Sequence, residues 1–289
     1  MADPSHPTQG IMPFIIEPSG AHTHSLILLH GLGSNGEKFG RELIETGICS
    51  DGKSLPSLLP GARFIFPTSK RRRSSAFKRA MLTQWFDVAS LEDPSYRSQT
   101  QFQGLEESSR DIFHLINAER FKVSHKNVIL GGISQGCAMG LLCLLALEFP
   151  LGGFIGMSGW LPFATQLEEI ANDDDDEAHF SGDENPFANS DVESDSCDAS
   201  VKVHEYAREL LSLESTGRSE ALHAFSTPVL LGHGEDDGKI VPSLGEQACR
   251  VLQSVGLEVE WESYEGQGHW YKVPDQIDDI AKFITKKLG

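Results

Sequence analysis

Several features of membrane and secreted proteins are missing from this chain of 289 residues. No uninterrupted apolar run approaches the ~18 residues that a membrane-spanning helix needs. The first residues lack the basic and apolar start of a secretory signal, Ala2 stands where myristoylation needs glycine, and no Asn-x-Ser/Thr sequon occurs. We therefore expect a soluble protein without stable membrane insertion, located in the cytoplasm or also in the nucleus.

Cysteine is scarce, and its few copies are scattered. Five cysteines are an odd number, and none of them forms a Cys-x-x-Cys pair. Such a set is typical of free thiols in a reducing compartment, and it argues against a small disulfide-stapled scaffold. The positions are Cys49, Cys137, Cys143, Cys197 and Cys249.

Positive charge is also in short supply, since 24 Lys and Arg face 42 Asp and Glu, for a formal net charge of −18. Nucleic-acid binding needs positive surface, so we expect no nucleic-acid partner. The imbalance is concentrated in residues 168–198, which hold 13 acidic residues. The segment Thr165–Ser200 is too polar to offset its ordering entropy, so we predict a disordered acidic insert.

This insert has three interpretations that the sequence leaves open. It could attract basic protein partners, pair with the basic loop Lys70–Arg79, or be a passive solvated loop. Its run Asp173–Glu177 lacks the spacing of an EF-hand calcium loop, so we predict no metal site there.

Short apolar segments alternate with helical patterns along the rest of the chain. Because the strands are continuously apolar, a parallel sheet covered on both faces is expected. The sequence thus predicts one doubly wound α/β domain over residues 1–289, interrupted at 165–200. Strands are predicted at Ser25–Leu29, Arg63–Phe66, Val128–Leu130, Gly153–Met157, Pro228–Leu231 and Leu257–Tyr264. Helices are predicted at Glu37–Thr46, Leu105–Phe121, from Met139 to Leu147, at Ser243–Val255 and at Asp275–Lys287.

The most informative motif is Gly132-Ile-Ser134-Gln-Gly136, which lies between an apolar strand and an apolar helix. This is the G-x-S-x-G pattern of a nucleophile elbow, a turn so sharp that the residues two positions before and after the serine must be very small, which glycine supplies. The turn exposes the serine oxygen and aims the first amides of the following helix at it. Ser134 is therefore the candidate nucleophile.

A serine of this kind needs a base and an acid, which on such a fold follow later in the chain in the order Asp, His. His269 follows the last predicted strand in a Gly-x-Gly-His turn, and it is the candidate base. Asp236 and Asp237 both follow the strand before it, and either could be the acid. His233, between these strands, is better explained as a structural hydrogen-bonding residue. This chemistry requires no cofactor and no metal.

An oxyanion hole would complete the site with two backbone N–H groups aimed at the developing negative charge. Gln135, the residue after the serine, is one expected donor. The loop His30-Gly-Leu-Gly33 follows an early strand, and its glycines let the backbone approach closely. Leu32 is the second expected donor.

Six motifs in order resemble the acyl-protein thioesterase/carboxylesterase branch of the α/β-hydrolases, also called the phospholipase/carboxylesterase family. The resemblance spans about residues 11 to 289 apart from the insert. The motifs are Leu28-Leu-His-Gly-Leu-Gly33, Gln84-Trp-Phe-Asp87, Gly131-Gly-Ile-Ser-Gln-Gly136, Ser158-Gly-Trp-Leu-Pro162, His233-Gly-Glu-Asp-Asp-Gly-Lys-Ile-Val-Pro242 and Tyr264-Glu-Gly-Gln-Gly-His269.

The resemblance implies an α/β-hydrolase fold and hydrolysis of S-acylated proteins or small acyl esters. It favours Asp237 as the acid, four residues after His233, although one extra residue before Val241 departs from the family pattern. It also places substrate-binding residues at Trp85, Phe86, Trp160 and Leu161, with core packing as the alternative for the first two. Rival interpretations are a carboxylesterase or lysophospholipase, a hydrolase-fold binding protein without turnover, and a scaffold acting through the insert.

Overall fold

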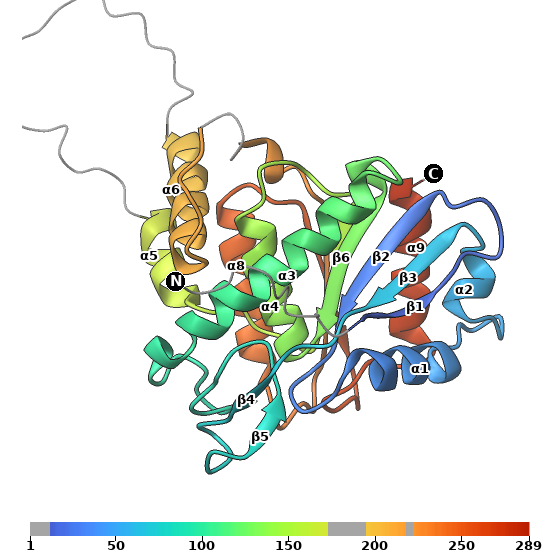
Figure 1. Ribbon diagram of the computed structural model, residues 1–289, viewed down its shortest axis with the longest axis horizontal. Helices are drawn as coiled ribbons and strands as arrows, with labels where there is room; N and C mark the ends of the chain where they lie inside the picture. The colour runs from blue at the N-terminus through green and yellow to red at the C-terminus, as the bar shows by residue number, and fades with distance from the viewer. Residues whose placement is uncertain (1–11, 173–194, 218–221, 289) are drawn as a thin grey trace, which may run out of the picture.

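The computed structural model describes residues 12–172, 195–217 and 222–288. Its centre is a seven-stranded sheet of order β1-β3-β2-β6-β7-β8-β9, in which only the edge strand β1 runs antiparallel to its neighbour (Figure 1). All the strands predicted from the sequence are present in it. The strands are β1 (Phe14–Ile16), β2 (His24–Leu29), β3 (Ala62–Phe66), β6 (Val128–Ile133), β7 (Gly153–Met157), β8 (Val229–Gly234) and β9 (Val259–Tyr264).

Helices cover both faces of this sheet, because successive strand residues point to opposite sides and are apolar on each. Ile27 and Leu29 of β2 belong to one hydrophobic cluster, with α3, α4, α6 and α8, whereas Leu26 and Leu28 belong to the other, with α1 and α9. The helices are α1 (Gly36–Thr46), α2 (Leu55–Leu58), α3 (Phe102–Arg120), α4 (Gln135–Leu145), α5 (Ala164–Asn172), α6 (Asp195–Leu210), α8 (Pro242–Ser254) and α9 (Asp275–Leu288), with short 3₁₀ turns at η1 (Ser98–Thr100) and η2 (His125–Asn127).

The predicted disorder of Thr165–Ser200 is wrong at both ends of that segment. Helix α5 covers its first residues and α6 begins at Asp195, and the two helices lie side by side (Figure 1). The reason is burial, since Leu167 is fully enclosed in the core and the Ser200 hydroxyl donates to the Val255 carbonyl at 2.8 Å. Residues 173–194, where most of the acidic side chains fall, lie outside the described residues.

The basic segment Lys70–Arg79 is not an irregular loop throughout. Strand β4 (Arg71–Arg73) pairs antiparallel with β5 (Met81–Thr83) in a separate hairpin. Helix α3 holds the hairpin by charge, because Lys70 and Arg72 lie 3.5 Å and 3.0 Å from the Glu107 carboxylate. The hairpin and α1 lie at the same end of the sheet, the end at which β6 finishes (Figure 1).

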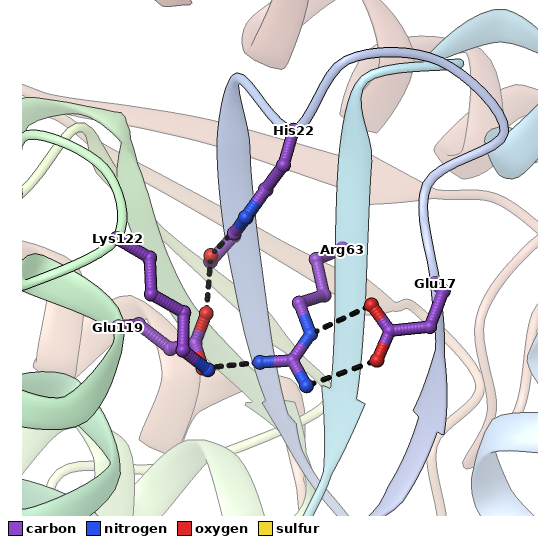
Figure 2. Close-up of polar contacts among 6 residues, drawn as sticks. Glu17, His22, Arg63, Glu119 and Lys122 are labelled. Carbon is purple, nitrogen blue, oxygen red and sulfur yellow. Dashed lines mark hydrogen bonds and ion pairs between the residues drawn. The ribbon is translucent and has the colours of Figure 1, made fainter.

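A charge network centred on the buried Glu119 lies at the opposite end of the strands (Figure 2). Arg63 at the start of β3 donates to Glu17 and Glu119, and the Glu119 carboxylate also accepts from Ser25 at 2.7 Å and Lys122 at 2.7 Å. The side chain of Glu119 is only 4% exposed, so every partner offsets a desolvation cost. The network joins β2, β3 and the end of α3 away from the candidate site.

Candidate active site

The turn after β6 has the geometry that its glycines predict. Ser134 has φ 55° and ψ −122°, and its N–H donates to the Met157 carbonyl of β7 at 2.8 Å. A Cβ added to Gly136 would lie 2.2 Å from the Leu29 carbonyl oxygen, and one on Gly132 would lie 2.8 Å from the same atom. Only glycine fits between the elbow and β2, and this close approach fixes the serine at the end of the sheet.

Side chains from three separate segments form a hydrogen-bonded chain that begins at this serine. The Ser134 Oγ lies 2.9 Å from His269 Nε2, and His269 Nδ1 lies 2.7 Å from Asp237 Oδ2. A carboxylate can only accept, so Nδ1 carries the proton and Nε2 is free to accept the serine proton. The arrangement can therefore generate a serine alkoxide equivalent, orient the imidazole and stabilise its cation.

The structure places Asp237, and not Asp236, on the histidine. Asp237 is 3% exposed, and its Oδ1 accepts from the backbone N–H groups of Lys239 and Ile240 at 2.9 Å and 3.0 Å. His233 shares its Nε2–H between the Ile240 carbonyl, at 2.9 Å, and Asp237 Oδ2, at 3.2 Å. Asp236 is exposed.

These hydrogen bonds decide the charge of Asp237. Burial by itself would raise the pKa of the carboxyl group, but the bonds from His233, His269 and the two backbone amides outweigh it and hold that pKa well below the usual range. The shift favours the ionised carboxylate beside His269. His233 thus has the structural role that its place in the sequence indicated.

The loop predicted to supply an oxyanion donor is held by His30. His30 Nδ1 donates to the Gly31 carbonyl at 2.7 Å, and its Nε2 accepts from the Ser69 N–H at 3.0 Å. The ring is fully buried, and burial lowers the pKa of His30 to about 4. A neutral imidazole in one fixed tautomer therefore orients the loop that contains Leu32.

The second expected donor, Gln135, is the first residue of α4. Its side chain does not reach the site, because Oε1 accepts from the Trp85 N–H at 3.0 Å and Nε2 donates to the Phe86 carbonyl at 2.7 Å. The clamp fixes the start of α4, and with it the backbone N–H of Gln135, against the Trp85–Phe86 segment. No pattern in the sequence indicates this role of the Gln135 side chain.

A cavity of about 650 Å³ opens beside Ser134 and His269. Its wall combines the Gly31–Ser34 loop, part of α1, the hairpin and the loop after β8. Most of the side chains are apolar, with three charged ones. The walls contain Gly31, Leu32, Gly33, Ser34, Lys38, Phe39, Glu42, Phe77, Leu82, Leu91, Ile133, Lys239, Ile240 and Trp270.

The residues that build this site lie in a chain that is similar to known proteins. The family model described as phospholipase/carboxylesterase matches residues 11–221, well over half of the chain. The chain belongs to this family. A second model, of the prolyl oligopeptidase family, matches residues 162–289.

Curated relatives of this family member span nearly its whole length. It is 24% identical to acyl-protein thioesterase 1 of Gibberella zeae, over 96% of each chain. It is 25% identical to acyl-protein thioesterase 1 of Saccharomyces cerevisiae, over 92% of this chain and 93% of the relative. It is 24% identical to carboxylesterase SOBER1 of Arabidopsis thaliana, over 91% and 90%. The phospholipase/carboxylesterase family member is thus an ester or thioester hydrolase.

A solved structure agrees on the fold. The crystal structure of Zea mays acyl-protein thioesterase 2 superposes with a TM-score of 0.64 at 24% identity, over 96% of this chain and 99% of the other. The family member therefore has the α/β-hydrolase fold that the motifs predicted.

Within this fold, the side chains expected to bind substrate lie in the core and not at the cavity. Trp85, Phe86, Trp160 and Leu161 are at most 3% exposed, and none lines the cavity beside Ser134. The Trp85 indole N–H donates to the His30 carbonyl at 2.8 Å, and Phe86 packs edge-on against Trp160 at 6.2 Å. These side chains support the catalytic loops from behind, so the assignment to the substrate pocket is corrected.

The cavity wall comes instead from residues that the sequence did not single out. Phe77 and Leu82 belong to the hairpin region, Phe39 to α1 and Leu91 to the segment before η1. Phe77 is 44% exposed within a basic run, and a single aromatic residue in such a run is no signal of a pocket, so the sequence contained no sign of this wall. Among the described residues, no cluster of three or more metal-ligating side chains occurs and no helix could span a membrane.

Proposed function

We propose that the protein is a serine acyl-protein thioesterase, with Ser134 as nucleophile, His269 as base, Asp237 as acid and the amides of Leu32 and Gln135 as oxyanion donors. The observation that carries the proposal is the hydrogen-bond chain from Ser134 Oγ through His269 to Asp237 at the wall of a mainly apolar cavity. The thioesterase relatives support the substrate class.

The reaction proceeds through an acyl-enzyme. Ser134 Oγ attacks the thioester carbon while His269 Nε2 takes its proton, and the oxyanion lies at the two amides. The C–S bond then breaks, and the imidazolium gives its proton to the leaving thiolate. Water, deprotonated by His269, attacks the acyl-serine, and the serine oxygen takes the proton back as the acid leaves.

A Ser134→Ala variant tests this mechanism. It should lose fluorophosphonate labelling and lose on the order of 10⁴-fold or more in turnover of an S-octanoyl peptide. Circular dichroism should show an unchanged fold. Near-normal turnover by the folded variant would contradict the assignment of the nucleophile, and folded wild-type protein that shows neither labelling nor turnover would favour a binding protein.

A carboxylesterase acting on small esters is the second candidate, since one near-full-length relative is a carboxylesterase. Parallel kcat/KM values on an S-octanoyl peptide, a p-nitrophenyl ester and a lysophospholipid separate the two. The expectation that the acidic insert recruits basic partners concerns residues outside the described part, and it stays a prediction.

A further inference from the structure

Two lysines with free ammonium groups line the cavity that contains Ser134 and His269. Lys38 lies in the first turn of α1, and Lys239 lies in the loop between Asp237 and α8. Both side chains are exposed, and within the described residues no carboxylate lies at ion-pair distance from either. Their charges are therefore available to a bound molecule.

Each lysine is fixed at its root by the catalytic framework. The Lys239 N–H donates to Asp237 Oδ1 at 2.9 Å, so its backbone cannot move without the acid. The Lys38 N–H donates to the side chain of Asn35, the N-cap of α1, at 2.8 Å, directly after the Gly31–Ser34 loop. The exposed side chains beyond these backbone contacts keep the freedom to reach a bound molecule.

The charges on the cavity wall are mixed, within a chain whose net charge is −18. Glu42 lines the cavity one turn after Lys38 and partly offsets it. Exposed sequence neighbours add both signs, with Lys78 and Arg79 beside Phe77, and with Glu37 and Asp236 beside Lys38 and Asp237. The wall itself therefore has two ammonium groups and one carboxylate. Because salt screens charges over about 8 Å, these groups act on a molecule that enters the cavity more than on the rest of the surface.

We propose, on the basis of the thioesterase function above, that Lys38 and Lys239 form an anion subsite for the leaving group. Preferred substrates would carry an anionic group beside the acylated thiol or hydroxyl. In this proposal the acyl chain packs on the apolar wall of Phe39, Phe77 and Trp270, and the ammonium groups of the two lysines, which line the same cavity, contact the leaving group.

The two halves of the reaction differ in what the subsite can affect. Once the C–S bond breaks, the leaving group is gone, and every substrate with the same acyl chain yields the same acyl-serine. The subsite therefore acts on kcat/KM, which includes acylation, and leaves the deacylation rate unchanged. A structural role for either lysine would lower both.

The test uses S-octanoyl tripeptides Ac-Gly-Cys-Xaa-amide with Glu, Gln or Lys at Xaa. For the wild-type protein we expect kcat/KM in the order Glu, Gln, Lys, with about 3- to 10-fold between the ends at low ionic strength and nearly none at 0.5 M NaCl. A second pair, 1-octanoylglycerol 3-phosphate against 1-octanoylglycerol, shows whether phosphate is the preferred anion. A preference for the Glu peptide alone identifies a carboxylate as the recognised anion, and a preference for the phosphate ester alone identifies a phosphate.

Variants assign the effect to the two lysines. Lys38→Gln and Lys239→Gln should each reduce the Glu/Lys ratio, the double variant should bring it to about 1, and Lys239→Glu should invert it. Glu42→Gln should raise it. Lys282→Gln, at an exposed position of α9 outside the cavity wall, is the matched control and should leave the ratio unchanged.

The subsite would be overturned if the wild-type protein preferred the anionic substrate in neither the peptide series nor the glycerol pair. A preference for the Lys peptide, or a Glu/Lys ratio that survives the double variant, would also overturn it. In each of these cases, turnover of the Gln peptide would leave the proposed thioesterase function intact. If the folded wild-type protein hydrolysed none of the peptides, the proposed function itself would fall.

Discussion

At the scale of single residues, two adjacent carboxyl groups differ in burial, since Asp237 is enclosed against His269 and Asp236 is exposed. Asp237→Asn should lower kcat by about 10³- to 10⁴-fold, because an amide neither holds the His269 tautomer nor stabilises its cation. Asp236→Asn, at an exposed side chain, should change kcat less than about threefold. Steady-state kinetics of both variants provide the comparison, and the reverse ranking would contradict the assigned acid.

His30 makes stability depend on pH. Its pKa is about 4 in the folded protein, whereas an unfolded histidine titrates near 6.5, so between these values the unfolded chain binds more protons. The free energy of unfolding should therefore increase as pH rises from 4 to 6.5, by about 3 kcal/mol at most from this residue. Below pH 4 both states are protonated, and above 6.5 neither is.

Urea unfolding at pH 4.5 and pH 7 tests this prediction. His30→Asn should be less sensitive to pH than the wild-type protein, whereas His114→Gln, an exposed control on α3, should behave like wild type. An unchanged pH dependence in His30→Asn would mean that His30 is not the buried neutral group that the structure indicates.

At the scale of elements, the elbow depends on the contact between α4 and β2. Gly136→Ala would place a methyl group 2.2 Å from the Leu29 carbonyl oxygen, so α4 must shift and carry Ser134 with it. We expect a loss of at least about 10²-fold in kcat/KM, since small displacements at a nucleophile are costly. Gly238→Ala, where an added Cβ meets nothing within 4 Å, is the control. Equal effects of the two substitutions would contradict the packing argument.

At the scale of the whole molecule, the Arg63 network stabilises the end of the strands remote from the site (Figure 2). Arg63→Met leaves the Glu119 carboxylate, 4% exposed, with Ser25 and Lys122 only. Unfolding free energy should fall by about 1–3 kcal/mol, with kcat unchanged. Arg41→Met, which removes the exposed pair with Glu37, should cost about 0–1 kcal/mol by the same denaturant measurement. Similar costs would contradict the importance of burial.

The acidic segment shows where whole-molecule reasoning from composition failed. Its composition predicted disorder throughout, but Leu167 near its start is buried, and α6 begins before its end. A deletion over Thr165–Ser200 would therefore remove core residues as well as charge. A test of the acidic charges themselves should be limited to residues 173–194.

What the sequence determined by itself is local chemistry in chain order. The alternation of apolar strands and helices predicted the α/β fold, and Gly132-Ile-Ser134-Gln-Gly136 predicted the turn at Ser134, because steric limits on a sharp turn act within a few residues. The placing of Ser134, an acid and His269 on one side of the sheet could also be expected, because each follows a strand and parallel strands end together.

Tertiary structure alone decided which way side chains point and what surrounds them. It put Asp237 rather than Asp236 on His269, turned Trp85 and Trp160 into the core, and built the cavity wall from the hairpin and α1. These outcomes depend on contacts between segments far apart in the chain. An aromatic residue has the same local preference in a core as in a pocket, so only its neighbours in space can distinguish the two.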